Sequence, residues 1–153
     1  MKSILMVCLG NICRSPLAEG ILRQKLENAG IRNVRVDSAG TSSYHTGEHP
    51  DERSVKNAKS HDVDISQLCA RQFSVEDFDT FDRIFVMDSS NYRDVIALAR
   101  NKSDEEKVEL LLNKKWPGKN KAVPDPYYQG PDGFETVFNL VQEACDEIVK
   151  ELK

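Results

Sequence analysis

One loop near the start of the chain sets the expectations for the whole fold, and it reads Cys8-Leu9-Gly10-Asn11-Ile12-Cys13-Arg14-Ser15. It follows the apolar run Ile4-Leu5-Met6-Val7, which is typical of a buried strand, and it precedes Pro16 and a helical pattern. A loop in this position turns its backbone N–H groups inward and ends at a positive helix N-terminus, so it binds anions. The same positive potential holds a thiol at its base as a thiolate. The arrangement predicts attack by Cys8 on a bound oxyanion, most simply a phosphate ester.

The spacing of Cys8 and Arg14 is weak evidence by itself, and the neighbouring residues strengthen it. Gly10 is expected to allow a backbone conformation that a Cβ atom would resist. Ser15 is expected to cap the following helix, with Pro16 at its first position. The alternative is that Cys8 is a buried residue ending the strand and that Arg14 is solvated at the start of the helix.

Apolar runs and helical patterns alternate along the chain. Strands are expected at residues 2–7, 34–37, 84–87 and 108–112, although Ser103-Asp104-Glu105-Glu106 is also a capping sequence for a helix that would include the last of these. Helical periodicity covers residues 17–29, 92–99 and 134–152, and an exposed loop is expected at 114–121. This alternation predicts a three-layer α/β sandwich with a parallel sheet. Ligands bind beyond the carboxyl ends of strands in such sheets, where Cys8 lies.

Seven short sequence blocks follow one another along the chain: Val7 through Pro16, Asp37-Ser38-Ala39-Gly40-Thr41, Pro50-Asp51-x-Arg53, Ala70-Arg71-Gln72, Met87-Asp88, Val123-Pro124-Asp125-Pro126-Tyr127-Tyr128 and Gly133-Phe134-Glu135. With them the chain resembles the low-molecular-weight protein tyrosine phosphatases, whose signature is Val-Cys-x-Gly-Asn-x-Cys-Arg-Ser-Pro. The resemblance implies a four-stranded parallel sheet flanked by helices. It also implies a metal-independent protein-tyrosine phosphatase without a cofactor.

Length and composition restrict the other possibilities. A chain of 153 residues is expected to form a single domain over residues 1–153. The net charge of −4 argues against nucleic acid as a partner, and the first apolar run is too short for a signal peptide or a membrane span. The four cysteines make no zinc pattern, so we expect no metal, reduced thiols and a cytoplasmic location. We expect a monomer whose partners are phosphotyrosine-containing proteins, with phosphate or another oxyanion bound in the loop.

Hydrolysis of an aryl phosphate needs a nucleophile, stabilisation of the phosphoryl oxygens and a proton for the leaving phenolate. Cys8 is the candidate nucleophile, and Arg14 has the planar fork that binds two phosphoryl oxygens. The residues expected to bind phosphate, mainly through backbone amides, are Leu9, Gly10, Asn11, Ile12, Cys13 and Ser15. Ser15 is also expected to donate a hydrogen bond to the Cys8 sulfur.

Asp125 is the candidate general acid. It stands between Pro124 and Pro126, whose fixed backbone angles would aim its carboxyl group. A phenol with a pKa of about 10 leaves much faster when it is protonated. Taken alone, Pro-Asp-Pro is better explained by a turn without catalytic function. The matching position in the related family favours Asp125 as the acid.

Other residues are expected to support the loop or to line the pocket. Asn11 is expected to bond local backbone and to adopt a left-handed conformation. The resemblance implies bracing by Ser38 and by a His before Ala70, but this sequence has no His there. Candidates for the pocket walls are Tyr44, for which packing is an equal alternative, and Tyr127 and Tyr128, which in the family flank the cleft and can be phosphorylated.

The remaining residues with reactive side chains are expected to have structural roles. We expect surface positions for His45, His49 and His61, core positions for Cys69 and Cys145, and a helix or loop brace at Asp88.

Three other functions compete with phosphotyrosine hydrolysis. An arsenate reductase of the same fold needs a close pair of further thiols, and Cys69 and Cys145 do not form one in sequence. A protein arginine phosphatase shares the loop, but apolar Ile12 favours a phenyl ring over a guanidinium, unless Ile12 only packs into the core. A phosphoprotein reader without activity would be expected to lack Cys8, Arg14 or Asp125. A protective Cys8–Cys13 disulfide is a further expectation, with Cys13 as a buried filler as the alternative.

Overall fold

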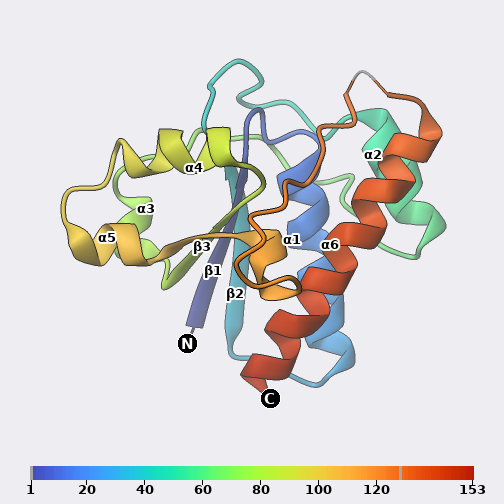
Figure 1. Ribbon diagram of the computed structural model, residues 1–153. Helices are drawn as coiled ribbons and strands as arrows, with labels where there is room; N and C mark the ends of the chain where they lie inside the picture. Colours follow the sequence, from blue (N-terminus) through green and yellow to red (C-terminus); the bar gives the residue numbers. More distant parts are fainter. Residues whose placement is uncertain (1, 128) are drawn as a thin grey trace.

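The computed structural model describes residues 2–127 and 129–153, and its centre is a four-stranded parallel sheet (Figure 1). The strands are β1 (Lys2–Cys8), β2 (Val34–Gly40), β3 (Arg83–Val86) and β4 (Val108–Leu110), in the order β2-β1-β3-β4. The α-helices are α1 (Arg14–Asn28), α2 (Glu52–Ser60), α3 (Asp77–Thr80), α4 (Ser89–Ile96), α5 (Lys102–Glu106) and α6 (Pro131–Leu152), and a 3-10 helix, η1 (Leu111–Lys114), follows β4.

Helices cover both faces of this sheet (Figure 1). Ile4 and Met6 of β1 belong to the apolar cluster that contains α1 and α6, and Leu5 and Val7 belong to the cluster that contains α3 and α4. All four side chains are fully buried, as expected for a central parallel strand covered on both sides. The three-layer α/β sandwich is therefore confirmed.

The strand register brings the carboxyl ends of three strands to one edge of the sheet. Cys8 pairs with Gly40, and Val7 pairs with Val86 of β3. The loops after β1, β2 and β3 therefore start side by side. A Cβ atom at Gly40 would lie only 2.8 Å from the Leu9 carbonyl oxygen, so the close approach of β2 to the loop after β1 requires glycine.

Three local features differ from the sequence predictions. Helix α1 begins at Arg14 with Cys13 at the N-cap, so Ser15 lies within the first turn and does not cap the helix. Asn11 has the left-handed φ of 58°, as predicted, but Gly10 does not have a positive φ. Residues 102–112, for which the sequence allowed either a helix or a strand, contain both. The five-residue helix α5 ends before β4, and β4 ends at Leu110, directly before η1.

Candidate active site

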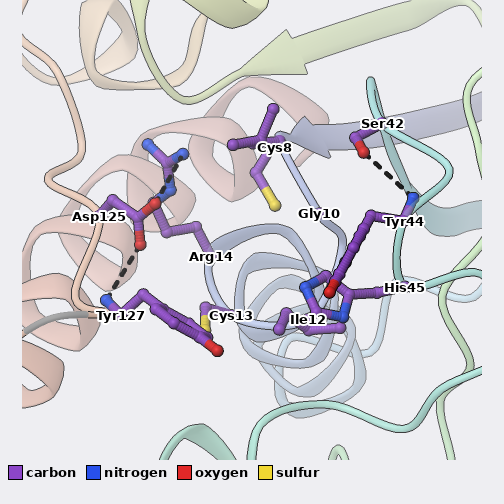
Figure 2. Close-up of a pocket in the computed structure, with 11 residues that line it drawn as sticks. Cys8, Gly10, Ile12, Cys13, Arg14, Ser42, Tyr44, His45, Asp125 and Tyr127 are labelled. Atoms are coloured by element: carbon purple, nitrogen blue, oxygen red, sulfur yellow. Dashed lines mark hydrogen bonds and ion pairs between the residues drawn. The ribbon is translucent and has the colours of Figure 1, made fainter.

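The loop after β1 forms the floor of a cleft of about 500 Å³ at the carboxyl edge of the sheet (Figure 2). The cleft is lined by Cys8, Leu9, Gly10, Ile12, Cys13, Arg14, Ser42, Tyr44, His45, Asp125 and Tyr127. These residues come from the loop and start of α1, from the segment after β2 and from the segment before α6. The structure thus brings the predicted Cys8, Arg14 and Asp125 together, although 117 residues separate the first from the last.

Two donors are directed at the sulfur of Cys8, which is 3% exposed and points into the cleft (Figure 2). The backbone N–H of Asn11 donates to Sγ over 3.3 Å, and the Ser15 hydroxyl oxygen lies 3.0 Å from it. The left-handed backbone of Asn11 turns its N–H back toward the strand end. Donors in this position stabilise the negative charge of a thiolate.

The side chain of Asn11 donates to the hydroxyl oxygens of Ser15 and Ser38. Asn11 Oδ1 accepts from the backbone N–H of Arg71 over 3.1 Å, so the amide group of Asn11 faces the two serine hydroxyls. Nδ2 donates to Ser15 Oγ over 2.8 Å and to Ser38 Oγ over 3.0 Å. The Ser15 oxygen accepts this bond, so its own hydrogen is available to donate to the Cys8 sulfur, 3.0 Å away, or to the Ala39 carbonyl oxygen, 3.4 Å away.

Ser38 likewise accepts from Asn11 Nδ2, and it donates to the buried carboxylate of Glu19 over 2.6 Å. Bracing of the loop by Ser38 is thereby confirmed. Asn11 bonds side chains and a distant backbone group rather than the local backbone that the sequence predicted.

Several loop amides are available to an oxyanion. Among the hydrogen bonds of the described residues, none uses the backbone N–H groups of Leu9, Gly10, Ile12, Cys13 or Arg14 as donors. These groups surround the floor of the cleft next to the N-terminus of α1. Converging N–H groups at a helix start bind phosphate and similar anions.

Arg14 is held with part of its guanidinium directed at the cleft. It is 3% exposed, and Nη1 donates to Asp88 Oδ2 over 2.8 Å and to the Val123 carbonyl oxygen over 2.9 Å. Burial by itself would lower the pKa of Arg14, but the Cys8 sulfur, Asp88 and Asp125 outweigh burial and raise the pKa above its ordinary value. Arg14 is therefore a permanent cation whose Nε and Nη2 remain for a ligand.

Asp88 has two roles that come from its two carboxylate oxygens. Oδ1 accepts from the backbone N–H of Asn91 over 2.8 Å and caps α4, which confirms the predicted brace. Oδ2 binds Arg14, a contact that the sequence analysis missed. The available signal was the position of Asp88 just after β3, at the same sheet edge as Cys8.

Asp125 lies at the mouth of the cleft, across from Cys8 (Figure 2). Its side chain is 45% exposed, and Oδ2 is 3.9 Å from Arg14 Nη2. Oδ1 accepts from the backbone N–H of Tyr127 over 3.0 Å. Its loop is tied to the end of β3 by the Val123 N–H, which donates to the Met87 carbonyl oxygen over 2.8 Å. The carboxyl group therefore lies at the open side of the cleft.

Aromatic side chains form the rim of the cleft. Tyr44 is 83% exposed and meets the His45 ring edge-on, with 4.8 Å between ring centroids. Tyr127 lies on the opposite side (Figure 2). Both predicted tyrosines therefore line the cleft, while Tyr128 lies outside the described residues.

His45 also lines the cleft, which corrects its expected role as a surface residue. Its Nδ1 is 3.0 Å from Glu48 Oε2. A Cβ atom at Gly10 would approach its ring carbon Cδ2 to 3.0 Å, so the small residue at position 10 makes room for this ring. The sequence contained no signal for this contact, because it depends on the course of the segment after β2.

The remaining cysteine and histidine predictions have mixed outcomes. Cys145 is fully buried, and burial raises its pKa to about 12, but Cys69 is exposed rather than part of the core. The family resemblance implied a His shortly before Ala70, and this chain has none there. At Leu68, two positions before Ala70, the backbone carbonyl accepts a hydrogen bond from Nδ1 of exposed His49 over 2.8 Å. His61 is half-buried, because its ring stacks on Phe138 with centroids 3.8 Å apart.

The described residues, 2–127 and 129–153, contain neither a metal-ligand cluster nor a membrane-spanning helix. Within them, no group of three or more His, Cys, Asp or Glu side chains is arranged to hold a metal ion. No helix among them is both long and apolar enough to cross a membrane.

Known proteins resemble this chain over nearly its whole length. The family model for low molecular weight phosphotyrosine protein phosphatase matches residues 3–153. A low molecular weight phosphotyrosine protein phosphatase of Schizosaccharomyces pombe is 44% identical over 151 residues, which cover 97% of this chain and 96% of that protein.

Solved structures agree with the sequence comparison. The crystal structure of a protein tyrosine phosphatase from Entamoeba histolytica has a TM-score of 0.93 at 35% identity, covering 99% of this chain and 97% of the other. The crystal structure of a Drosophila arginine phosphatase has a TM-score of 0.91 at 33% identity, covering 100% and 98%.

Proposed function

The chain belongs to the low molecular weight phosphotyrosine protein phosphatase family, and we propose that its Cys8, Arg14 and Asp125 hydrolyse phosphotyrosine through a cysteinyl-phosphate intermediate. One observation carries the assignment of these residues: the sulfur, the guanidinium and the carboxylate face a single cleft (Figure 2). The family is metal-independent, and the proposed steps use only groups of this chain.

In the first step the Cys8 thiolate attacks the phosphorus atom, and the bond from phosphorus to the tyrosine oxygen breaks. The loop N–H groups and the Nε and Nη2 atoms of Arg14 bind the three remaining phosphoryl oxygens as their charge redistributes. Protonated Asp125 donates its proton to the leaving phenolate. Dephosphorylated tyrosine and cysteinyl phosphate are the products.

In the second step a water molecule attacks the same phosphorus atom from the side that the phenol has left. Asp125, now a carboxylate, accepts a proton from this water. The bond between sulfur and phosphorus breaks, and inorganic phosphate leaves. The Ser15 hydroxyl, 3.0 Å from Sγ, stabilises the thiolate as the leaving group.

The shape of the cleft favours a phosphorylated tyrosine. Cys8 lies at its floor, and Tyr44 and Tyr127 stand at its rim, so a phenyl ring spans the depth between them. Phosphoserine and phosphothreonine are too short to reach the sulfur while their backbone stays outside. Ile12 adds an apolar wall that suits the face of the ring.

Phosphoarginine is the second candidate substrate. The likeness to the Drosophila arginine phosphatase supports it, because the two structures share the fold over the whole chain. The apolar side chain of Ile12 argues against it, since this wall offers no hydrogen-bond acceptor to a guanidinium.

The proposal also includes one catalytic domain over residues 1–153 that acts as a monomer in the cytoplasm. The family match to residues 3–153 supports the single domain. The four free cysteines, Cys8, Cys13, Cys69 and Cys145, suit a reducing compartment.

The test is phosphate release from phosphotyrosine, phosphoserine and phosphoarginine peptides with a metal chelator present. We expect phosphotyrosine to have the highest kcat/KM. Cys8→Ser should abolish turnover and still bind phosphate, because the loop amides and Arg14 remain. Substantial turnover by Cys8→Ser, or a preference of the wild type for phosphoarginine, would overturn the respective part of the proposal.

A further inference from the structure

The guanidinium of Arg53 lies where three segments of the molecule meet. Arg53 is the second residue of α2, and its Nε and Nη2 donate to Oδ1 and Oδ2 of Asp51 over 3.0 and 2.9 Å. The side-chain hydrogen bonds from Arg53 hold the pKa of Asp51 below its ordinary value. The planar fork of Arg53 is thus fixed in one orientation at the start of α2.

Asp51 attaches this pair to the phosphate-binding loop. Its carboxylate accepts from the backbone N–H of Arg53 over 2.9 Å and so caps α2. Its own backbone N–H donates to the Ile12 carbonyl oxygen over 2.8 Å. Asp51 therefore links the guanidinium of Arg53 directly to the loop that contains Cys8.

The face of the guanidinium contacts the segment that carries the candidate acid. Its central carbon lies 5.3 Å from the ring centroid of Tyr127 and 4.9 Å from that of Phe134, both within the range of cation–π attraction. Tyr127 is bonded through its backbone N–H to Asp125 Oδ1 over 3.0 Å. Phe134 is 3% exposed in the first turns of α6, where that segment ends.

We propose that Arg53 is a positioning residue for the general acid: it holds the Asp125–Tyr127 segment at a fixed distance from the phosphate-binding loop. The proposal rests on the proposed function, in which Asp125 protonates the leaving group. The carboxyl group of Asp125 is half-exposed, and its contact across the cleft is an ion pair of 3.9 Å with Arg14. A carboxyl group must lie within hydrogen-bond reach of the leaving oxygen to transfer its proton. Arg53 supplies this placement through Tyr127, without touching the substrate.

The consequence is a specific change in leaving-group dependence. The value of kcat/KM contains the steps up to departure of the phenol, where the acid acts. Poor placement of Asp125 slows esters of weakly acidic phenols and leaves esters of strongly acidic phenols nearly unchanged, because the latter depart without a proton. A displaced Tyr127 wall, in contrast, would weaken binding of all aryl esters alike.

The experiment measures kcat/KM for aryl phosphates whose phenols have pKa values from about 4 to about 10. For Arg53→Met we expect a loss of about ten-fold at the high end and less than about two-fold at the low end, a fraction of the 10²–10⁴ that a general acid contributes. Arg53→Lys keeps the charge without the planar fork and should fall in between. The matched control is Arg35→Met on β2, which removes a guanidinium whose central carbon lies 5.2 Å from the centroid of the Phe81 ring. This variant should leave kcat/KM unchanged for all the aryl phosphates.

A second variant keeps the test valid if Arg53→Met does not fold. Asp51→Asn retains a residue that caps α2 but removes the carboxylate that binds the Arg53 guanidinium. As in Arg53→Met, kcat/KM should fall more for esters of weakly acidic phenols than for esters of strongly acidic ones. Equal loss for all leaving groups, or none, in a folded Arg53→Met or in Asp51→Asn would overturn the positioning role. Failure of the proposed function looks different: the wild type would be inactive, or Asp125→Ala would lose the same factor in kcat/KM for all leaving groups.

Discussion

Cys13 shares the loop with Cys8, and its surroundings keep it a neutral thiol. Burial raises the pKa of Cys13 to about 12, and the negative charges of Asp51, Cys8 and Asp125 act in the same direction. At pH 7, about one Cys13 side chain in 10⁵ is therefore a thiolate. We predict that peroxide oxidises the Cys8 thiolate to a sulfenic acid, and that Cys13 then displaces hydroxide from that sulfur to form a disulfide. The scarcity of the Cys13 thiolate limits the rate of this second reaction.

The charge on Asp51 gives a way to change that rate. Asp51→Asn removes the strongest of the charges that act on Cys13 and keeps a residue that caps α2. Loss of one like charge lowers the pKa of a partly buried group by about one unit, which makes the thiolate about ten-fold more abundant. The thiolate becomes about three-fold less nucleophilic, because the Brønsted slope is about 0.4–0.5. We therefore expect disulfide formation to be about three-fold faster.

The pH dependence of the wild type follows from the direction of the same shift. Below the raised pKa the thiolate fraction of Cys13 increases with pH, so the rate of disulfide formation should rise about ten-fold per pH unit between about pH 6.5 and 8.5. Oxidation of Cys8 assists the reaction, because it neutralises one of the charges that raise the pKa of Cys13.

The assay adds peroxide, stops the reaction with acid, alkylates free thiols and measures the peptide that contains Cys8 and Cys13 by mass spectrometry. The ratio of disulfide to Cys8 sulfinic acid reports how often Cys13 reacts first. The control is Asp64→Asn, an exposed acid whose carboxylate bonds Ser66 and which is not among the charges that act on Cys13. If Asp51→Asn forms the disulfide at an unchanged or slower rate, or if the wild-type rate does not depend on pH, the Cys13 thiolate does not limit disulfide formation.

Four further substitutions test the site. Asp125→Ala should slow esters of weakly acidic phenols by about 10²–10⁴ in kcat/KM and acidic ones much less; equal losses would remove it as the acid. Asp88→Asn keeps a cap for α4 but loses a charge-assisted bond, so denaturant unfolding should show about 1.5–3 kcal/mol less stability, with a lower kcat/KM. Ile12→Thr should shift the ratio of kcat/KM values from phosphotyrosine toward phosphoarginine peptides; an unchanged ratio would mean that Ile12 only packs. Gly40→Ala should cost about 1–3 kcal/mol, because its methyl group meets the Leu9 carbonyl; unaltered unfolding would contradict this.

The sequence predicted the elements whose apolar residues repeat with a clear period. Strands β1, β2 and β3 and the long helices α1 and α6 bury apolar residues along most of their length, whereas three-residue β4 was also compatible with a helix. Helix α2 was not predicted, because only Ser54 and Ala58 of its residues are buried. Helix α3 has four residues and is too short to show a period. Elements with little apolar burial leave no such signal.

The predicted site followed from local chemistry, and the missed contacts depend on tertiary structure. Cys8 and Arg14 lie next to one another because a loop and a helix start follow a strand, which the sequence shows directly. The contact of Asp88 with Arg14 and the position of His45 on the cleft depend on strand order and on the course of loops. The expected capping role of Ser15 failed for a related reason: its hydroxyl has buried partners, Asn11 and Cys8, that compete with the helix backbone.

The direction of the hydrogen bonds around Asn11 connects the architecture of the loop to its chemistry. The backbone N–H of Arg71 can only donate, so the oxygen of the Asn11 amide faces it and the nitrogen faces the two serines. Each serine oxygen accepts one hydrogen bond from that nitrogen and must direct its own hydrogen elsewhere. For Ser38 the acceptor is Glu19, and for Ser15 the acceptors within reach are the Cys8 sulfur, 3.0 Å away, and the Ala39 carbonyl oxygen, 3.4 Å away. A backbone group 63 positions along the chain from Cys8 thus leaves the hydrogen of Ser15 available, and a thiolate, which can only accept, is the nearer of its two acceptors.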